Sequence, residues 1–275
     1  MTMAVRSGAL DFIGSTLSRT ANDAQGNLKR MATGMRIVRS ADDPAASAVA
    51  SNLSSRLRSN GRAIRNATEG LAMLEVGDSA AGQIIETLQR MRELAVQAAS
   101  DTLLDDSRSP LQKEFGALKD EIERIGDQLT FNGRKLADGS VAKISVQVGI
   151  NKAGENRISL KLGDYTLATL GLDAPTVEVA TSANARTSID VVDGAIGQVS
   201  SSRSVYGALI NRVEASIRHA ATTSMSLSAA EGRLVDADYA REASALTANR
   251  ILLYAGQSSR MQAAQMSRSV IHLLR

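Results

Sequence analysis

The chain of 275 residues contains 43% hydrophobic residues but only three Phe, four Tyr and no Trp, which favours thin packing of helices on helices over a thick aromatic core. Its 32 basic and 29 acidic residues are interspersed, so no patch of one sign favours nucleic acid or a membrane as a partner. The absence of cysteine excludes disulfides and thiol catalysis, and no apolar run has the length of a membrane span or a signal-peptide core.

The first predicted element is an amphipathic helix from Leu10 to Met35, in which apolar residues recur at steps of seven. Its apolar stripe is narrow, so the helix needs a neighbour to stay folded. Cap-forming Ser40, Asp42 and Asp43 follow it, and Pro44 suits the first turn of another helix.

The longest helical pattern runs from Ala45 to Ser100 without a proline. Two adjacent rows at steps of seven predict a coiled-coil seam. One row contains Leu53, Asn60, Ala67, Leu74, Ala81, Leu88 and Ala95, and the other contains Ala50, Leu57, Ile64, Leu71, Asp78, Ile85 and Arg92. The stretch is predicted to form one very long helix, either continuous or jointed at Gly61, Gly70 or Gly77. Small and polar residues interrupt both rows, so a plain amphipathic bundle helix fits the pattern as well. Both interpretations require partner helices.

The middle of the chain changes its period. A polar connection at residues 101–110 reverses the chain, and apolar residues in steps of four and three predict a third helix at residues 111–129. Alternating apolar and polar residues then predict a β-hairpin at about residues 143–162. Residues 163–187 have little pattern, and either a further strand or a loose surface segment is expected there.

A second long helix is predicted from Ile189, with a seven-residue row that consists of Val192, Val199, Tyr206, Val213, Ala220, Leu227 and Leu234. A last amphipathic segment completes the chain. The predicted fold class is mainly α, a long antiparallel helical bundle or coiled coil with a small β-hairpin and paired N- and C-terminal helices. Residues 1–44 with 236–275 are expected to form a terminal-helix domain, and residues 45–235 a long-helix bundle domain.

Catalytic sites have little support in the residues. Neither His219 nor His272 has a second histidine or a glutamate at the spacing of a zinc hydrolase, and neither a P-loop nor a GxSxG motif is present. The acidic pairs at 42–43 and 105–106 fall at expected helix caps or loops. We therefore predict no catalytic residue, no cofactor and no metal site.

Several blocks of the sequence resemble the bacterial flagellin family, and together they cover most of the chain. The most specific is LQRMRELAVQAA at residues 88–99. The others include LKRMATGMRI at 28–37 with SADDPA at 40–45, NATEG at 66–70, EIERI at 121–125, FNG at 131–133 and DADYARE at 236–242. The family's variable outer domains have no counterpart in the short middle of this chain.

The resemblance implies a structural subunit that polymerises into the extracellular flagellar filament for swimming motility. Its terminal helices would form an inner tube, and its long helices and hairpin the next shell. A hook-filament junction protein, which shares the terminal pattern, is one alternative. A non-filament coiled-coil scaffold or adhesin that forms closed oligomers is another.

The partners implied are copies of the chain, other flagellins, a flagellar export chaperone, and the filament cap and junction proteins, with type III export and no cleaved signal peptide. Subunit contacts are expected at apolar positions of the terminal helices, namely Leu10, Leu17, Leu28, Met31, Leu246, Leu253, Met261, Leu273 and Leu274. These helices are expected to be disordered in the free subunit and to fold on assembly.

A host innate immune receptor is a further partner that the resemblance implies. Arg90, Leu94 and Glu114 occupy the positions through which such receptors recognise many flagellins. The alternative for these three residues is a contact between subunits.

Overall fold

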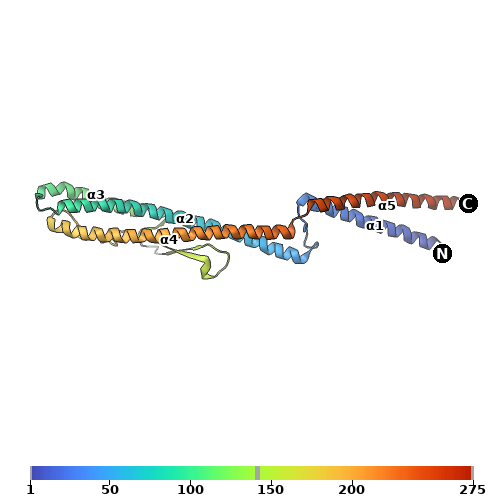
Figure 1. Ribbon diagram of the computed structural model, residues 1–275, viewed down its shortest axis with the longest axis horizontal. Helices are drawn as coiled ribbons and strands as arrows, with labels where there is room; N and C mark the ends of the chain where they lie inside the picture. Colours follow the sequence, from blue (N-terminus) through green and yellow to red (C-terminus); the bar gives the residue numbers. More distant parts are fainter. Residues whose placement is uncertain (1, 140–142, 274–275) are drawn as a thin grey trace. The chain divides into compact units, whose positions relative to one another are not determined.

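The structure is a computed structural model that describes residues 2–139 and 143–273, with side chains described for 11–104, 106–139 and 143–266. Five helices account for most of the chain, as the heptad rows predict (Figure 1). In chain order the elements are α1 (Thr2–Thr33), α2 (Pro44–Ala98), α3 (Asp105–Gln128), β1 (Thr130–Phe131), β2 (Arg134–Lys135), β3 (Lys143–Gln147), the short 3-10 helix η1 (Gly154–Asn156), β4 (Arg157–Lys161), α4 (Ser182–Val235) and α5 (Tyr239–Leu273).

The chain divides into two compact units, a terminal unit of residues 1–57 with 226–275 and a central unit of residues 58–225. The division falls inside α2 and α4, whereas the domain boundaries expected from the sequence fall at helix ends.

The core of the central unit lies between α2, α3 and α4. One predicted heptad row of each long helix supplies it, because Ala67, Leu74, Ala81, Leu88 and Ala95 are buried on α2, and Val192, Val199, Tyr206, Val213 and Ala220 are buried on α4. The second row predicted on α2, from Ala50 to Arg92, contains no buried residue, so that part of the prediction is wrong. A different row is buried instead, which consists of Ala63, Gly70, Gly77, Ile84, Met91 and Ala98. Phe115 and Ile122 of α3 complete this core. The predicted antiparallel bundle is therefore confirmed.

The polar residues that interrupt the rows of α2 have partners on α4. Asp78 pairs with Arg203 (3.0 Å), and Arg92 pairs with Asp193 (2.6 Å). The buried amide of Asn60 donates to the Ala220 carbonyl (2.6 Å) and to the Ser224 hydroxyl (2.8 Å). The two ion pairs have opposite polarity, and a shift of the seam by one heptad separates both of them. These polar residues therefore favour the observed register.

The glycines of α2 do not interrupt the helix, which is continuous over 55 residues. They allow close packing instead. A Cβ at Gly70 would lie 3.1 Å from the Val146 side chain, and one at Gly77 would lie 3.5 Å from the Tyr206 ring. The absent side chains thus let the β-hairpin and α4 approach α2.

The β-hairpin predicted at about 143–162 is present. Strands β3 and β4 are antiparallel, with Ile144 opposite Leu160 and Val146 opposite Ile158. Val146 and Leu160 both contact the Gly70 position of α2. The apolar face of the hairpin therefore packs on the central helix.

A strand or a loose surface segment was expected at residues 163–187, and this prediction is wrong, because residues 163–181 are partly buried and residues 182–187 belong to α4. The segment is irregular, and its buried side chains are Tyr165, Leu170, Leu172, Val177 and Val179. The Tyr165 hydroxyl donates to the Tyr206 hydroxyl (3.1 Å), which also accepts the Gly163 N–H (2.7 Å). Burial raises the pKa of the Tyr165 hydroxyl well above its ordinary value, so this group remains a donor. Isolated apolar residues on irregular backbone have no period, so pattern analysis missed them.

The start of α3 also differs from the prediction. This helix begins at Asp105, so Pro110 lies inside it rather than at a break. Leu104 occupies the N-cap position, and its side chain makes no cap hydrogen bond.

Candidate assembly surface

Backbone hydrogen bonds connect the C-terminal end of α1 to the N-terminal end of α5. The chain leaves α1 at Gly34, whose φ of 69° suits glycine. The Gly34 carbonyl then accepts the Ala237 N–H (2.9 Å), and Met35 forms a β-bridge with Asp236. Asp238 caps α5 by accepting the N–H groups of Ala240 (3.0 Å) and Arg241 (3.2 Å).

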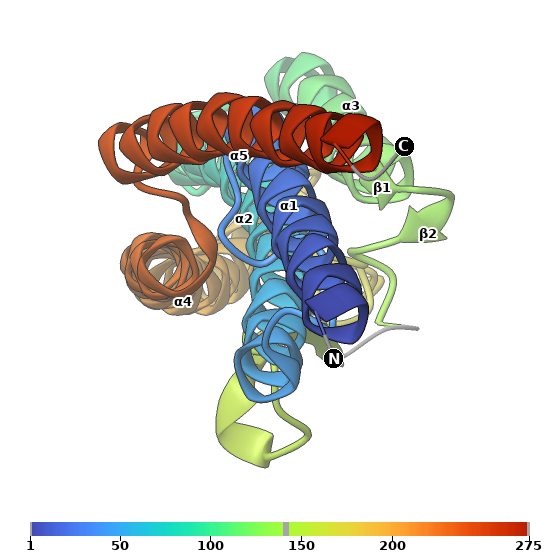
Figure 2. The same cartoon turned by 90° about the vertical axis from the view of Figure 1, so that its right-hand side faces the viewer.

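Contacts along α1 and α5 show that the two helices run antiparallel. Arg30 forms an ion pair with Glu242 (3.1 Å), and the Tyr239 hydroxyl donates to the Met31 carbonyl. Farther along, a Cβ at Gly256 would collide with Leu17. Both chain termini lie at the same end of the pair, and the helices diverge toward them (Figures 1 and 2).

The seam between α1 and α5 buries few side chains. Among the described residues of these two helices, Ala24 and Leu246 are the buried hydrophobic side chains, and Asn27 is buried beside them. Leu17, Met31 and Leu253 are half-buried. A two-helix pair with such a small core is marginal in isolation.

Most large apolar side chains of this pair are exposed. On α5, Ile251 (63% exposed), Tyr254 (72%) and Met261 follow one stripe, and Leu252 and Met266 lie two heptads apart on another. Phe12 and Leu28 are exposed on α1. Covering each large apolar side chain contributes about 1.5–3 kcal/mol. The surface formed by these seven residues, here called the apolar surface, is the candidate for contacts between copies.

The predicted interface residues fall into three groups. Leu28 and Met261 belong to the apolar surface, whereas Leu17, Met31 and Leu253 line the seam between α1 and α5. Leu246 is buried in that seam, so its side chain is not available to another copy. The side chains of Leu10 and Leu273, and all of Leu274, lie outside the described residues.

Sequence reasoning missed five members of the apolar surface, namely Phe12, Ile251, Leu252, Tyr254 and Met266. The signal was present in α5, where apolar residues occupy more heptad positions than a single partner helix covers. The sequence pattern does not show which of these stripes packs against α1, because that depends on how the two helices pair in three dimensions.

The residues considered for receptor contact do not form one exposed group. Arg90 donates to Glu114 through Nε (2.8 Å) and Nη2 (2.6 Å), and to Glu93 through Nη1 (3.0 Å). These bonds raise the pKa of Arg90 above its ordinary value, chiefly through Glu114. Leu94 is 1% exposed and packs in the core of the central unit. Only Arg90 and Glu114 are therefore accessible on the surface.

In the part of the chain that the structure describes, no three His, Cys, Asp or Glu residues are grouped as a metal site requires. No described helix contains a stretch sufficiently long and apolar to cross a bilayer.

Comparison with family models gives two matches. The model of the bacterial flagellin N-terminal helical region matches residues 13–142, and the model of the bacterial flagellin C-terminal helical region matches residues 189–274. The two matches include α2, α3 and α4 almost entirely, and most of α1 and α5.

Similar proteins extend over nearly the full length. A flagellin from Halalkalibacterium halodurans is 35% identical over 92% of this chain and 93% of its own length. A flagellin from Bacillus subtilis is 32% identical over 95% and 97%. The flagellar filament 33 kDa core protein of Treponema phagedenis is 31% identical over 96% of both chains.

Two solved structures resemble the fold. The crystal structure of Bacillus cereus flagellin covers 57% of this chain and 88% of its own, with a TM-score of 0.50 and 30% identity. A putative flagellar hook-associated protein from Vibrio parahaemolyticus covers 71% of this chain and 100% of its own, with a TM-score of 0.60 and 16% identity. At that identity the second match concerns the fold alone.

Proposed function

This chain belongs to the bacterial flagellin family, and we propose that its copies join through the apolar surface of α1 and α5. The chain is a structural subunit of the extracellular bacterial flagellar filament, which forms by self-polymerisation. The observation that carries the proposal is the exposure of large apolar side chains on the terminal helices, with Tyr254 72% and Ile251 63% exposed.

The physical basis is the imbalance between the seam and the apolar surface. The seam buries too little to hold two helices of 32 and 35 residues firmly. Other copies supply the missing cover, and a heterologous contact that does not close on itself produces an open helical polymer. We place the terminal-helix domain, residues 1–44 with 236–275, in the inner tube of that polymer.

The experiment is elongation from filament seeds with purified Ile251→Asp. This side chain is exposed in the subunit, so the substitution spares the α1–α5 seam and places an unpaired charge in the proposed contact between copies. We expect unchanged helicity by circular dichroism and loss of elongation, whereas the apolar control Ile251→Val still elongates.

Elongation of Ile251→Asp at the wild-type rate would overturn the proposed surface. Electron microscopy of the wild-type product separates the function classes, because a filament subunit forms open tubes and a scaffold or adhesin forms closed particles.

We also propose that the chain leaves the cell unfolded through the flagellar type III apparatus, with an export chaperone, and adds beneath the filament cap. Family membership supports this route, and the cysteine-free sequence removes one covalent obstacle to unfolding. N-terminal sequencing of filament protein tests it, because loss of a long N-terminal peptide would indicate a signal peptidase.

Recognition by a host innate immune receptor is proposed for Arg90 and Glu114 only. The supporting observation is that this ion pair is exposed on the central unit. A receptor reporter assay with free subunits carrying Arg90→Ala should give a weaker response than wild type. An unchanged response would leave these residues without that role.

A further inference from the structure

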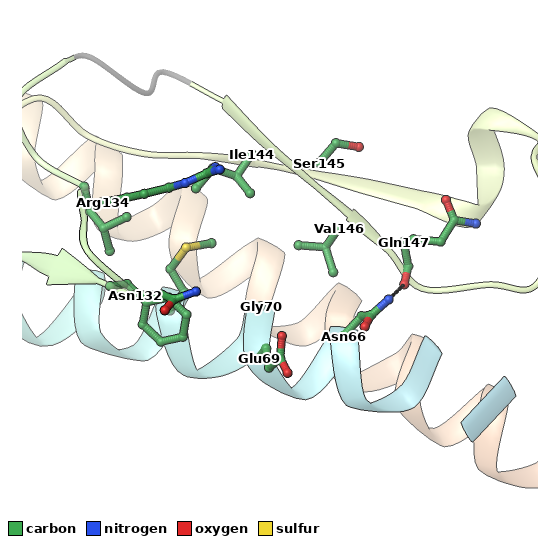
Figure 3. A pocket seen from close by; sticks show the side chains of 12 residues that line it. Asn66, Glu69, Gly70, Asn132, Arg134, Ile144, Ser145, Val146 and Gln147 are labelled. Atoms are coloured by element: carbon green, nitrogen blue, oxygen red, sulfur yellow. Dashed lines mark hydrogen bonds between the residues drawn. The ribbon is translucent and has the colours of Figure 1, made fainter. Parts of the chain in front are cut away.

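A groove of about 380 Å³ lies on the central unit between α2 and strands β1 to β3 (Figure 3). Its apolar lining includes Met73, Phe131, Leu136, Ile144 and Val146. Arg134 lies at one end of the groove, and Asn66, hydrogen-bonded to the Gln147 carbonyl, lies at the other. An apolar lining with polar ends suits an apolar side chain flanked by polar neighbours.

The tip of the central unit presents an exposed apolar side chain, Leu104, which follows Leu103 and precedes two aspartates. Among the described large hydrophobic side chains, Leu104 has the largest exposed fraction, 77%. It also occupies the N-cap of α3 without a cap hydrogen bond, at a position where Ser, Thr, Asp or Asn stabilises a helix. Leu104 thus contributes little to the fold of its own subunit, and its side chain is accessible to a second copy.

We propose that Leu104 of one copy docks into this groove on a second copy within the filament. The inference rests on the proposed function, which brings copies together. On α2, the groove at Gly70 and the end of the helix at Ala98 are separated by roughly 40 Å at 1.5 Å per residue. The two patches are different and are displaced along the helix, so repetition of this contact between copies that point the same way produces an open row.

Charge complementarity favours a second copy as the occupant. Two acidic side chains are described in the tip segment 101–106, Asp101, which is paired with Arg186 (2.8 Å), and Asp106, which is exposed. The groove has Arg134 at its rim, and an adjoining hollow that shares Asn66 and Gln147 is lined by Arg62 and Lys152. Glu69 is the acidic residue of the groove lining. The basic excess around the groove matches the acidic tip.

The first test uses Leu104→Ser, which separates stability from assembly. A serine at the N-cap is expected to raise the unfolding midpoint of the free subunit. Removal of the docking side chain is expected to raise the critical concentration for seeded growth roughly tenfold or more. The control Leu104→Met keeps an apolar side chain and should grow as wild type does. A critical concentration for Leu104→Ser equal to that of wild type would overturn the inference.

The second test exploits the absence of cysteine from the chain. A variant with both Leu104→Cys and Ser145→Cys is assembled above its raised critical concentration, and the filaments are treated with a short bismaleimide, since Ser145 is exposed in the groove lining. We expect a ladder of covalent oligomers on denaturing gels. The matched control carries Leu104→Cys with Ser204→Cys, which is exposed on α4 and outside the groove lining, and should give no ladder.

The outcomes distinguish the two proposals. The Leu104→Cys and Ser145→Cys variant can form normal filaments and yet give no ladder, or give the same products as the control. Either result would overturn the docking inference alone. A wild-type chain that forms no filament from seeds overturns the proposed function and, with it, the inference.

Discussion

The central unit and the terminal unit use the same seven-residue period with different results. In the central unit α2 packs against α3, α4 and the β-hairpin, and large side chains such as Leu88, Phe115 and Tyr206 are buried. In the terminal unit α1 packs against α5, and the described buried hydrophobic side chains are Ala24, Ile37 and Leu246. We therefore expect the number of neighbours, and not the strength of the heptad pattern, to determine whether these helices are stable in a single subunit.

A leucine-to-alanine substitution should lower the stability of the subunit in the central unit, and should weaken filament growth in the terminal unit. Leu88→Ala removes a side chain that is 0% exposed, so we expect the free energy of unfolding to fall by about 2–5 kcal/mol. Leu252→Ala, at an exposed position of α5, should change it by less than about 0.5 kcal/mol and should instead weaken filament growth. Urea unfolding of free subunits and seeded growth measure the two effects.

Similar losses of unfolding free energy for Leu88→Ala and Leu252→Ala would contradict the claim that only the central unit has a complete core within one chain. Unimpaired filament growth by Leu252→Ala would remove Leu252 from the apolar surface.

A smaller effect is expected from the hydrogen bonds that fix residues 163–181 in the central unit. Tyr206→Phe keeps the ring against Gly77 but leaves the buried Tyr165 hydroxyl and the Gly163 N–H without their acceptor. We expect a loss of about 1–3 kcal/mol in unfolding free energy. Tyr165→Phe, which leaves the Gly163 bond in place, should cost less. An equal or larger loss for Tyr165→Phe would show that the Gly163 contact contributes nothing.

The smallest effect concerns a carboxylate in the terminal unit. Asp42 accepts the N–H groups of Arg39 (2.8 Å) and Val38 (3.0 Å), and these bonds lower its pKa below the ordinary value. A lowered pKa stabilises the folded linker at pH values above the ordinary value of about 3.9, and this stabilisation is lost as the pH falls below it. Asp42→Asn should flatten that dependence, measured by amide exchange in the linker between about pH 3 and 5. An identical pH profile in the variant would exclude this role for Asp42.

Regular periodicity made much of the central unit predictable. The rows through Leu74 and Val199 placed α2 and α4 in contact, and alternation placed β3 and β4. The acidic residues at 42–43 were expected as caps, and the Asp43 carboxylate accepts the Ala46 N–H (2.9 Å) at the start of α2. Such features depend on local sequence, which is why they could be predicted.

The features that escaped prediction depend on three-dimensional packing. Tyr165 and Leu172 are buried by irregular backbone that has no repeat. On α5, several apolar stripes satisfied the heptad pattern, and only the crossing with α1 decides that Leu246 faces the seam while Ile251 faces outward. The groove at Gly70 is likewise formed by α2 and strands that are distant in the sequence.

The most direct test of the account is amide hydrogen exchange measured on the free subunit and on the assembled filament. We predict that residues 73–98 of α2 are protected in both states, because their core is complete within one chain. Residues 12–33 of α1 and 239–266 of α5 should exchange rapidly in the free subunit and gain strong protection only in the filament. Equal protection of these terminal helices in both states would contradict the claim that other copies complete their core.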